Sequence, residues 1–343
     1  MKALVLTQYN HLELQDWPKP EIAADEVLIR IAACGICGSD IHGMDGSTGR
    51  RQPPLIMGHE AAGTISEVGA DVQGWVVGDR VTFDSTVYCG ECWFCRRGDV
   101  NLCDKRRVLG VSTGEYRRHG AFAEFVNVPQ RILVKLPEAV TFSQAAMVEP
   151  VSIALHAVRR TPLELNDTVV VVGAGMIGLF VIQALRAAGC GKIFAVDLDQ
   201  SRLDVAVKLG ADEGFLSNKV DVPAEIQRRT NGRGADAAFE VVGITPTLQT
   251  AIAVLRKGGQ LTLVGNLSPK TELPLQLVVT RELTLHGSCA SNGEYPACLD
   301  MIARGVIKVE PMITAEAPLS DGDAWFHRLK IGGDNLLKVL LKP

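Results

Sequence analysis

One stretch of ten residues, Val169-Val-Val-Val-Gly173-Ala-Gly175-Met-Ile-Gly178, places the strongest constraint on how this chain can fold. An apolar run, glycines spaced G-x-G-x-x-G and a second apolar run predict a buried strand, a tight turn and a helix. Gly173 allows the turn, Gly175 lets the backbone approach a pyrophosphate, and Gly178 permits close packing of helix on strand. The phosphates of a dinucleotide would then face the unpaired N–H groups of the helix N-terminus.

A carboxylate ends the next predicted strand, Lys192–Asp197. At that position Asp197 is expected to accept hydrogen bonds from both hydroxyls of an adenosine ribose and to repel a 2′-phosphate. NAD is therefore favoured over NADP, although the nearby Arg202, expected beside the adenine or the diol, keeps NADP open. Further cofactor contacts are expected at Ile177, Val264 and Gly265.

Strand and helix patterns alternate from residue 151 to about residue 289. Near-continuous apolar strands belong to a parallel sheet that is covered by helices on both faces. The predicted fold class of this part is therefore α/β, a doubly wound parallel sheet of the Rossmann type. The expected elements are Val151–Arg159, Val169–Val172, Ile177–Ala188, Lys192–Asp197, Ser201–Leu209, Ala224–Thr230, Ala235–Val241, Thr247–Leu255 and Gln260–Val264.

Residues 1 to about 150 have a β-rich pattern instead. Short alternating or apolar runs, separated by Gly, Pro and Asp, predict an irregular, partly closed barrel. The tail, from about 290 to 343 with a strand-like segment at Leu337–Leu341, is expected to return to this first domain. The strands expected before residue 150 are Lys2–Leu6, Glu26–Ala33, Ala62–Val68, Arg80–Phe83 and Ala123–Val128.

Composition is that of a globular protein, with 47% hydrophobic and 22% charged residues among 343, which is enough chain for two cores. The formal net charge is −4 and the charges are interspersed, which argues against nucleic acid or an acidic membrane as a partner.

The N-terminus lacks the apolar core of a signal peptide. The uncharged run Thr168–Leu185 fits a buried strand and helix better than a membrane span. A soluble cytoplasmic protein is expected.

Four of the nine cysteines lie within fifteen residues, at Cys89, Cys92, Cys95 and Cys103. This spacing in a loop-rich segment suits tetrahedral zinc, and a closed shell of four thiolates leaves no position for a substrate. Such a site would stabilise a lobe that has too few apolar residues to fold alone. An iron–sulfur cluster is the competing interpretation.

A second group of possible ligands lies in the stretch Cys34-Gly-Ile-Cys37-Gly-Ser-Asp-Ile-His42. Taken alone, its C-x-x-C pair is compatible with a redox dithiol, half of a zinc site, or two buried thiols. A His-Glu pair follows at His59-Glu60 and another carboxylate at Glu149.

These motifs together resemble the zinc-containing medium-chain alcohol dehydrogenase/reductase family. The resemblance rests on C-G-S-D at 37–40, G-H-E-x2-G-x5-G at 58–69, the four-cysteine segment and the glycine turn, and it runs from end to end. The stretch from Glu149 to His156 is similar to the polyol branch, of sorbitol or galactitol type. The resemblance implies a GroES-like catalytic domain over 1–150, completed by about 290–343, and a Rossmann domain over 151–289, with catalytic zinc and nicotinamide in a cleft between them.

For the catalytic zinc, the resemblance assigns Cys37 and His59 as ligands, with Glu60 as a third directly or by exchange. Glu149 would bind the zinc directly or through its water. Three protein ligands and an open position suit a catalytic zinc, at which a bound alcohol can be ionised. A second, structural zinc would be held by the four cysteines.

For the proton and its surroundings, Ser39 would take the hydroxyl proton of the substrate and pass it through the nicotinamide ribose to His42. Hydride would leave the same carbon for NAD. Asp40 is expected to orient His59. Cys34 is expected to be a buried thiol beside the site, and His156 a packed helix residue rather than a ligand.

The sequence departs from the sorbitol-type pattern where the substrate would bind. The aromatic residue and the arginine of that type are absent from Asp40–Met44 and from Gly287–Asn292. The loop Ser112–Gly120 is longer and more basic than usual, so Arg117 and Arg118 are candidates for recognising a sugar phosphate or sugar acid. A plain sorbitol dehydrogenase is therefore not expected.

The predicted function is a zinc-dependent oxidation of a secondary alcohol of a polyol or sugar derivative by NAD. A diol, a threonine-like amino alcohol or a simple secondary alcohol is the alternative substrate. A zinc protein that binds nucleic acid through the cysteine lobe is a third interpretation, which the acidic charge balance opposes. The resemblance also implies a homotetramer or homodimer, paired through an edge strand near Glu282–Ser288.

Overall fold

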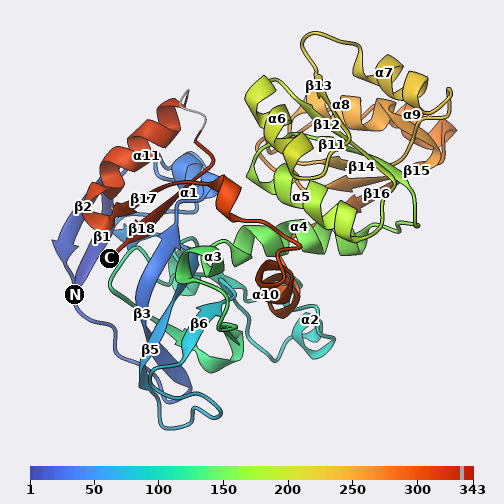
Figure 1. Cartoon of the computed structure of the whole chain (residues 1–343). Helices are drawn as coiled ribbons and strands as arrows, with labels where there is room; N and C mark the ends of the chain where they lie inside the picture. The colour runs from blue at the N-terminus through green and yellow to red at the C-terminus, as the bar shows by residue number, and fades with distance from the viewer. Residues whose placement is uncertain (333–335) are drawn as a thin grey trace. The chain divides into compact units, whose positions relative to one another are not determined.

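The computed structural model describes residues 1–332 and 336–343, which form two compact units (Figure 1). Unit 1 consists of Met1–Glu149, Asn292–Gly305 and Val309–Pro343, and unit 2 of Pro150–Ser291 and Val306–Lys308. The chain thus leaves unit 1 along helix α4 (Val148–Arg160) and later returns to it.

Unit 2 is built on a six-stranded parallel sheet with the order β13-β12-β11-β14-β15-β16. All five residues of the central strand β11 are buried, which explains why its sequence is a run of valines with no alternation. Strand order reverses between β11 and β14, the point at which sheets of this type bind their ligands. The strands are β11 (Thr168–Val172), β12 (Lys192–Asp197), β13 (Glu213–Leu216), β14 (Ala235–Glu240), β15 (Leu255–Leu263) and β16 (Thr284–Gly287).

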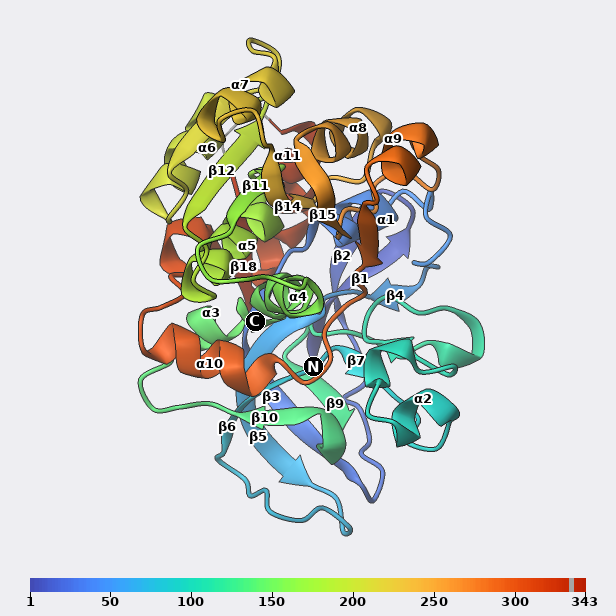
Figure 2. The ribbon, with the colours of Figure 1, turned by 90° about the vertical axis from the view of Figure 1, so that its right-hand side faces the viewer.

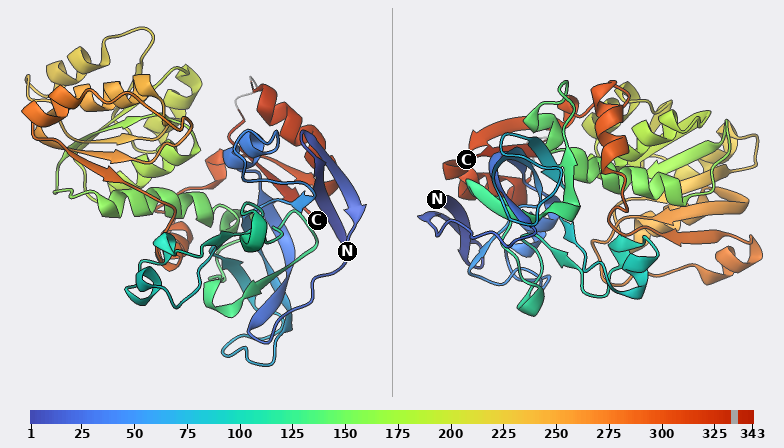
Figure 3. Two further views of the ribbon diagram at one scale, coloured as in Figure 1. Left: turned by 180° about the vertical axis from the view of Figure 1, so that it is seen from behind. Right: turned by 90° about the horizontal axis from the view of Figure 1, so that it is seen from below.

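Helices pack against this sheet (Figure 3), α5 and α6 on β11 to β13, and α8 on β11, β14 and β15. The uncharged run at 168–185 is therefore strand β11 followed by most of α5. Within the described residues, no helix combines the length and apolarity needed to cross a bilayer. The helices are α5 (Met176–Ala187), α6 (Gln200–Lys208), α7 (Val222–Arg229), α8 (Thr245–Ala253) and α9 (Leu275–Thr280).

Unit 1 contains a seven-stranded sheet in the order β10-β6-β5-β3-β18-β17, with β9 also paired to β3, and a three-stranded sheet β2-β1-β4. An isolated bridge pairs Ala3 of β1 with Ala123, two residues before β9. One apolar core contains residues of both sheets. Strand bounds are β1 (Lys2–Gln8), β2 (His11–Asp16), β3 (Glu26–Gly35), β4 (Leu55–Ile56), β5 (Glu60–Val68), β6 (Arg80–Phe83), β9 (Phe125–Pro129), β10 (Leu133–Lys135), β17 (Ile313–Pro318) and β18 (Lys338–Lys342).

Short elements complete unit 1, and Figure 2 shows the lobe around α2 as a loop-rich extension of it. These elements are α1 (Gly38–Gly43), β7 (Thr86–Val87), α2 (Trp93–Arg96), β8 (Arg107–Val108), α3 (Phe142–Ala145), α10 (Tyr295–Ala303), α11 (Gly322–Ile331) and 3₁₀ turns at Val100–Leu102, Gly114–Tyr116, Gln130–Ile132, Glu310–Met312 and Leu319–Asp321.

Two features of the tail and of β15 differ from expectation. The last part of the chain adds α10, α11 and β17 to unit 1, whereas the sequence predicted only the final strand. Strand β15 begins at Leu255, five residues before the predicted start, because a bulge between its pairs with Ala235 and Ala237 accommodates Gly258, whose φ is 68°. Two adjacent glycines normally interrupt a strand, so the pattern predicted a later start.

Candidate metal and cofactor sites

Three of the predicted ligands meet in unit 1. The ligand atoms of Cys37, His59 and Glu60 all lie within 4.8 Å of one another. Cys37 precedes helix α1, and His59 and Glu60 stand at the start of strand β5. His59 and Glu60 are 5% and 1% exposed, so the group is a buried cluster of polar atoms that needs compensating partners.

Helix α1 aims its first donors at the Cys37 sulfur. The Ser39 backbone N–H and hydroxyl donate to Cys37 Sγ at 3.4 and 3.2 Å. In return, an Asp40 carboxylate oxygen accepts from the Cys37 N–H at 3.3 Å. The C-G-S-D motif is thus a capping box with sulfur as the acceptor, and it fixes the sulfur at a helix N-terminus, where negative charge is stabilised.

Asp40 is buried between an arginine and the candidate histidine. Arg51 donates to Asp40 Oδ1 through Nε at 3.1 Å and Nη2 at 2.8 Å, and His59 Nδ1 lies 3.5 Å from the same oxygen. Burial opposes the ionised carboxyl, but the charges of His59 and Arg51 outweigh it and hold the pKa of Asp40 well below its ordinary value. The charge of Asp40 in turn raises the pKa of His59 above its ordinary value, against the opposing effect of burial.

Glu60 has a buried cation of its own. Lys338 Nζ donates to Glu60 Oε2 at 2.5 Å and to the Ile36 carbonyl at 3.0 Å. The pair exists because β18 lies beside β3, which packs against β5. Gly35 leaves the space for it, since a Cβ there would lie 2.4 Å from Glu60 Oε2.

Glu149 is not one of the residues whose ligand atoms all lie within 4.8 Å of one another. Burial, and next the negative charge of Glu60, raise the pKa of Glu149 to about 7, while the charge of His59 lowers it. The carboxyl is therefore close enough to feel both residues electrostatically. Of the two carboxylates, Glu60 is thus the one that joins Cys37 and His59 in the compact cluster.

The cluster fits a zinc ion. Thiolate, imidazole and carboxylate are zinc ligands, and three of them leave a fourth position open. His59 Nδ1 is buried without a hydrogen bond of good geometry in the described part of the chain, which is an unfavourable state unless an ion or a closer Asp40 satisfies the ring.

The four cysteines of the lobe also converge. Their sulfur atoms lie within 4.8 Å of one another, and the Cys89 and Cys95 sulfurs are 3.9 Å apart. Sulfurs at ~2.3 Å from a tetrahedral zinc are about 3.8 Å apart, so the spacing fits one ion better than a cluster of several irons. Backbone N–H groups of Cys95 and Asp104 lower the pKa of Cys92 to about 6, which favours the thiolate that binds metal.

In unit 2 the glycine turn has the predicted geometry. Gly173 has a φ of 105°, and a Cβ at Gly178 would lie 1.9 Å from the Gly173 carbonyl oxygen. Nothing lies within 4 Å of a Cβ position at Gly175, the N-cap residue directly before α5. Asp197 Oδ2 accepts from the Ala174 N–H at 2.7 Å, so this carboxylate and the turn form one continuous surface at the carboxyl ends of β11 and β12.

The remaining predicted residues fall into place as follows. Val264 and Gly265 follow β15 and donate to the Glu240 carbonyl, and Ile177 lies in the first turn of α5. Arg202 is an exposed residue of α6. His42 is exposed in the last turn of α1.

Two residues that were not expected to bind metal lie outside the cluster. Cys34 is fully buried, and burial raises the pKa of its thiol. All nine cysteines are thiols, which excludes a disulfide between Cys34 and Cys37. His156 is a buried residue of α4.

Arg51 and Lys338 are the important residues that sequence reasoning missed. Neither belongs to a motif, and they lie 11 and 278 residues from the acids they pair with. The only local signal was a pair of adjacent arginines, Arg50-Arg51, shortly before the Gly-His-Glu motif.

The structure does not support a substrate role for Arg118. Its Nη2 pairs with the buried carboxylate of Glu26 at 2.6 Å and donates to the Asn127 carbonyl at 3.2 Å. The guanidinium therefore ties the loop to β3 and β9. Arg117 and Arg118 both line a pocket of about 490 Å³, in which Trp17 and His119 pack edge to face.

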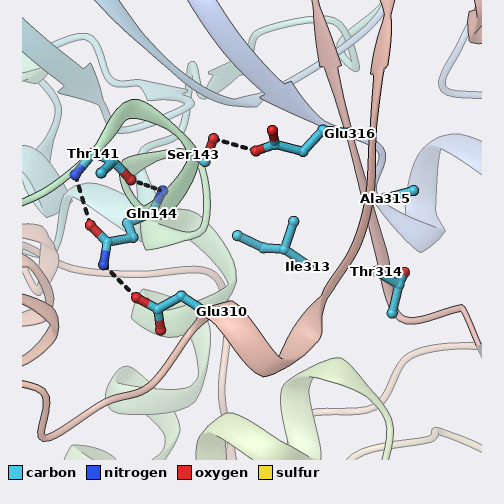
Figure 4. Close-up of a pocket in the computed structure, with 8 residues that line it drawn as sticks. All are labelled: Thr141, Ser143, Gln144, Glu310, Ile313, Thr314, Ala315 and Glu316. Carbon is cyan, nitrogen blue, oxygen red and sulfur yellow. Dashed lines mark hydrogen bonds between the residues drawn. The ribbon is translucent and has the colours of Figure 1, made fainter.

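Another pocket of unit 1, of about 410 Å³, lies between α3 and β17 (Figure 4). Its polar side chains satisfy one another, with Gln144 donating to Glu310 at 2.5 Å and Ser143 to Glu316 at 2.5 Å. Glu316 also pairs with Lys342. These contacts fasten α3 to the tail, so we assign the pocket a structural role.

Comparison with known proteins identifies both parts of the chain. Residues 23–138 match the family model of the alcohol dehydrogenase GroES-like domain, and residues 177–304 match that of the zinc-binding dehydrogenases. With the parallel sheet of unit 2, these matches confirm the predicted fold class.

Curated relatives and solved structures match over nearly the whole length. Sorbitol dehydrogenase of Bacillus subtilis is 34% identical, covering 100% of this chain and 97% of that protein. D-arabitol-phosphate dehydrogenase of Enterococcus avium is 34% identical, covering 97% and 94%. The crystal structure of galactitol-1-phosphate dehydrogenase from Escherichia coli is 28% identical with a TM-score of 0.93, covering 100% of both chains.

Because Asp40 and Arg51 are 0% and 2% exposed as side chains, replacing Arg51 with Met should leave an uncompensated buried charge. We expect the free energy of unfolding, measured in urea, to fall by about 3 to 5 kcal/mol. The double variant Asp40→Asn/Arg51→Met should recover part of that loss. Equal stability of Arg51→Met and wild type would show that the pair does not hold the site together.

Proposed function

The chain belongs to the zinc-containing medium-chain alcohol dehydrogenase/reductase family, and from this premise we propose that it oxidises a secondary alcohol of a polyol or sugar derivative with NAD. The observation that carries the proposal is the buried cluster of Cys37, His59 and Glu60, which is held by two internal cations. The relatives named for sorbitol, arabitol phosphate and galactitol 1-phosphate support a polyol as the substrate.

Cys37, His59 and Glu60 would hold the catalytic zinc, with Glu149 beside them. A zinc ion bound there acidifies a coordinated alcohol and polarises its C–O bond. Asp40 fixes the ring of His59, and Lys338 limits how far Glu60 can move, since it is itself anchored on the Ile36 carbonyl. Held in this way, Glu60 would serve as the third ligand, directly or by exchange.

Ser39 and His42 are proposed to carry the proton away. They lie three residues apart in α1, which places them on one face of the helix, and both are exposed. Ser39 Oγ accepts from Arg51 Nη2 at 3.1 Å. Arg51 occupies one lone pair of this oxygen, so the second lone pair can accept the proton of the substrate hydroxyl. The Ser39 O–H, which donates to Cys37 Sγ in this structure, would then turn to pass its own proton on.

The four-cysteine lobe is proposed to hold a structural zinc. Of the four cysteines, only Cys103 is buried. Helix α2 has no buried residue. A lobe with so little core needs the ion for its fold. Thiolates in this state suit the reducing cytoplasm, where we propose that the protein works.

NAD is the proposed cofactor, since Asp197 places a carboxylate at the carboxyl end of β12. A 2′-phosphate would be repelled there, whereas ribose hydroxyls would be accepted. Arg202 lies five residues further on. Hydrogen bonds from Ser201, and after them the charge of Arg202, lower the pKa of the nearby Asp199.

A homo-oligomer is proposed because unit 2 ends in an open edge. Within the described residues β16 pairs only with β15. Three apolar side chains of the neighbouring α9 are exposed, namely Leu275 at 62%, Leu277 at 41% and Val279 at 65%. An open edge beside exposed apolar residues is a surface that proteins usually cover.

The activity itself is tested by following NADH formation with sorbitol, galactitol 1-phosphate and D-arabitol phosphate. We expect turnover that a zinc chelator abolishes and added zinc restores. Cys37→Ala should lose more than about a hundredfold in kcat, because even residues that only orient a metal ligand contribute about 10- to 100-fold. Cys34→Ala, a change in the neighbouring buried thiol, should keep its activity. Turnover that survives complete removal of zinc would refute the proposal.

Asp197→Asn should weaken discrimination against NADP. The amide keeps an oxygen for the Ala174 N–H but loses the charge, so KM for NADP should fall and KM for NAD should rise about tenfold. Asp199→Asn, two residues away, serves as the control. An unchanged preference in Asp197→Asn would mean that another group selects the cofactor.

Sedimentation velocity tests the oligomer. We expect the wild type to sediment as a dimer or tetramer, and Leu275→Asp/Val279→Asp to sediment as a smaller species because the charges cannot be buried. Leu165→Asp, at an 84% exposed position of the same unit, should change nothing. A wild type that is monomeric at micromolar concentration would exclude the proposed surface.

A further inference from the structure

A small pocket of unit 1 combines two arginines with hydroxyl groups. It has a volume of about 230 Å³, and none of the described residues that line it is acidic. Arg50 and Arg106 supply the charge, Ser112 and Thr113 supply hydroxyls, and Tyr116 and two valines complete the lining. Such a lining suits a small anion.

Arg50 is the cation most available to a ligand. It is exposed, and its side chain makes no ion pair or hydrogen bond with the described residues. Arg106 is held in place at two points. Its side-chain Nη1 donates to the Asn101 carbonyl at 3.0 Å, and its backbone N–H donates to the Cys103 carbonyl at 3.2 Å. One guanidinium of the pocket is therefore fixed by the cysteine lobe, and the other is free to close on a ligand.

The hydroxyl groups can act as donors. Ser112 Oγ accepts from the Val108 N–H at 2.8 Å, which leaves its own proton for another acceptor. Tyr116 differs, because its hydroxyl is engaged by Glu115, which raises the pKa of Tyr116. Tyr116 therefore lines the pocket without offering its hydroxyl as a hydrogen-bond donor.

Both segments that line the pocket are next to residues that hold the metal cluster. Arg50 directly precedes Arg51, which contacts Asp40 and Ser39. On the other side, Gly110 packs so closely on the residues before His59 that a Cβ there would lie 2.8 Å from the Met57 carbonyl carbon. A ligand in this pocket is thus held by the two segments that also position the candidate catalytic residues.

We propose that this pocket binds the phosphate monoester at the end of the polyol whose secondary hydroxyl is oxidised. The proposal rests on the proposed function and narrows its substrate to an anionic polyol. Two guanidinium groups and two hydroxyls offer more donors than the two oxygens of a carboxylate can use, and three phosphate oxygens match them better. Arg50 and Arg106, rather than the Glu26-bound Arg118, are the residues proposed to recognise the acidic group.

The test compares galactitol with galactitol 1-phosphate, and D-arabitol with D-arabitol phosphate, in wild type and Arg50→Gln. We expect wild type to prefer the phosphorylated member of at least one pair, and Arg50→Gln to raise its KM at least tenfold with the neutral polyol unchanged. Arg50→Lys should keep part of the preference. Arg107→Gln is the matched control, since Arg107 is exposed in the same segment but lines the pocket of Trp17.

The outcomes separate the two proposals. Oxidation of neutral polyols with no preference for phosphate, or an equal change for both substrates in Arg50→Gln, would overturn the phosphate site and leave the proposed function standing. A stronger preference for L-idonate would assign the pocket to a carboxylate instead and would also overturn it. If no alcohol is oxidised, binding of inorganic phosphate decides, measured by ³¹P NMR, and equal binding by wild type and Arg50→Gln would contradict the site.

Discussion

The buried ion pair of Asp40 and Arg51 is the interaction on which the geometry of the candidate metal site depends. Asp40 touches the start of α1, the ring of His59 and the guanidinium, so one carboxylate fixes two of the three cluster residues. A buried charge is retained only with a partner in good geometry. The pair therefore holds two parts of the site in place. It fixes the loop that carries Arg51, and it fixes the residues proposed to bind the metal.

A second buried pair supplies the same restraint from the far end of the chain. Lys338 of the last strand reaches Glu60, so the C-terminal strand has to be in place before the cluster is complete. The last strand of the chain therefore belongs to the candidate site, although unit 2 separates it from Glu60 in the sequence. The four-cysteine lobe depends on a metal in another way, since its own apolar surface is too small for a core.

Much of this could be predicted from the sequence, because the strongest signals are local. The valine run and the glycine spacing predicted β11, its turn and α5, and the cysteine spacing predicted the lobe. The two buried pairs could not be found, since opposite charges 11 or 278 residues apart leave no periodic pattern. The structural role of Arg118 in the basic loop could not be predicted for a related reason. From the sequence alone, Arg118 is a candidate for binding a ligand. Only the structure reveals that it pairs with Glu26.

The central claim is that Cys37, His59 and a carboxylate form a metal site distinct from the lobe. The most direct measurement is the zinc content per chain of the purified protein, determined by mass spectrometry of metals. The account predicts two zinc ions in the wild type and one in His59→Gln, with the lobe still filled. One ion in the wild type, or two retained in His59→Gln, would contradict it.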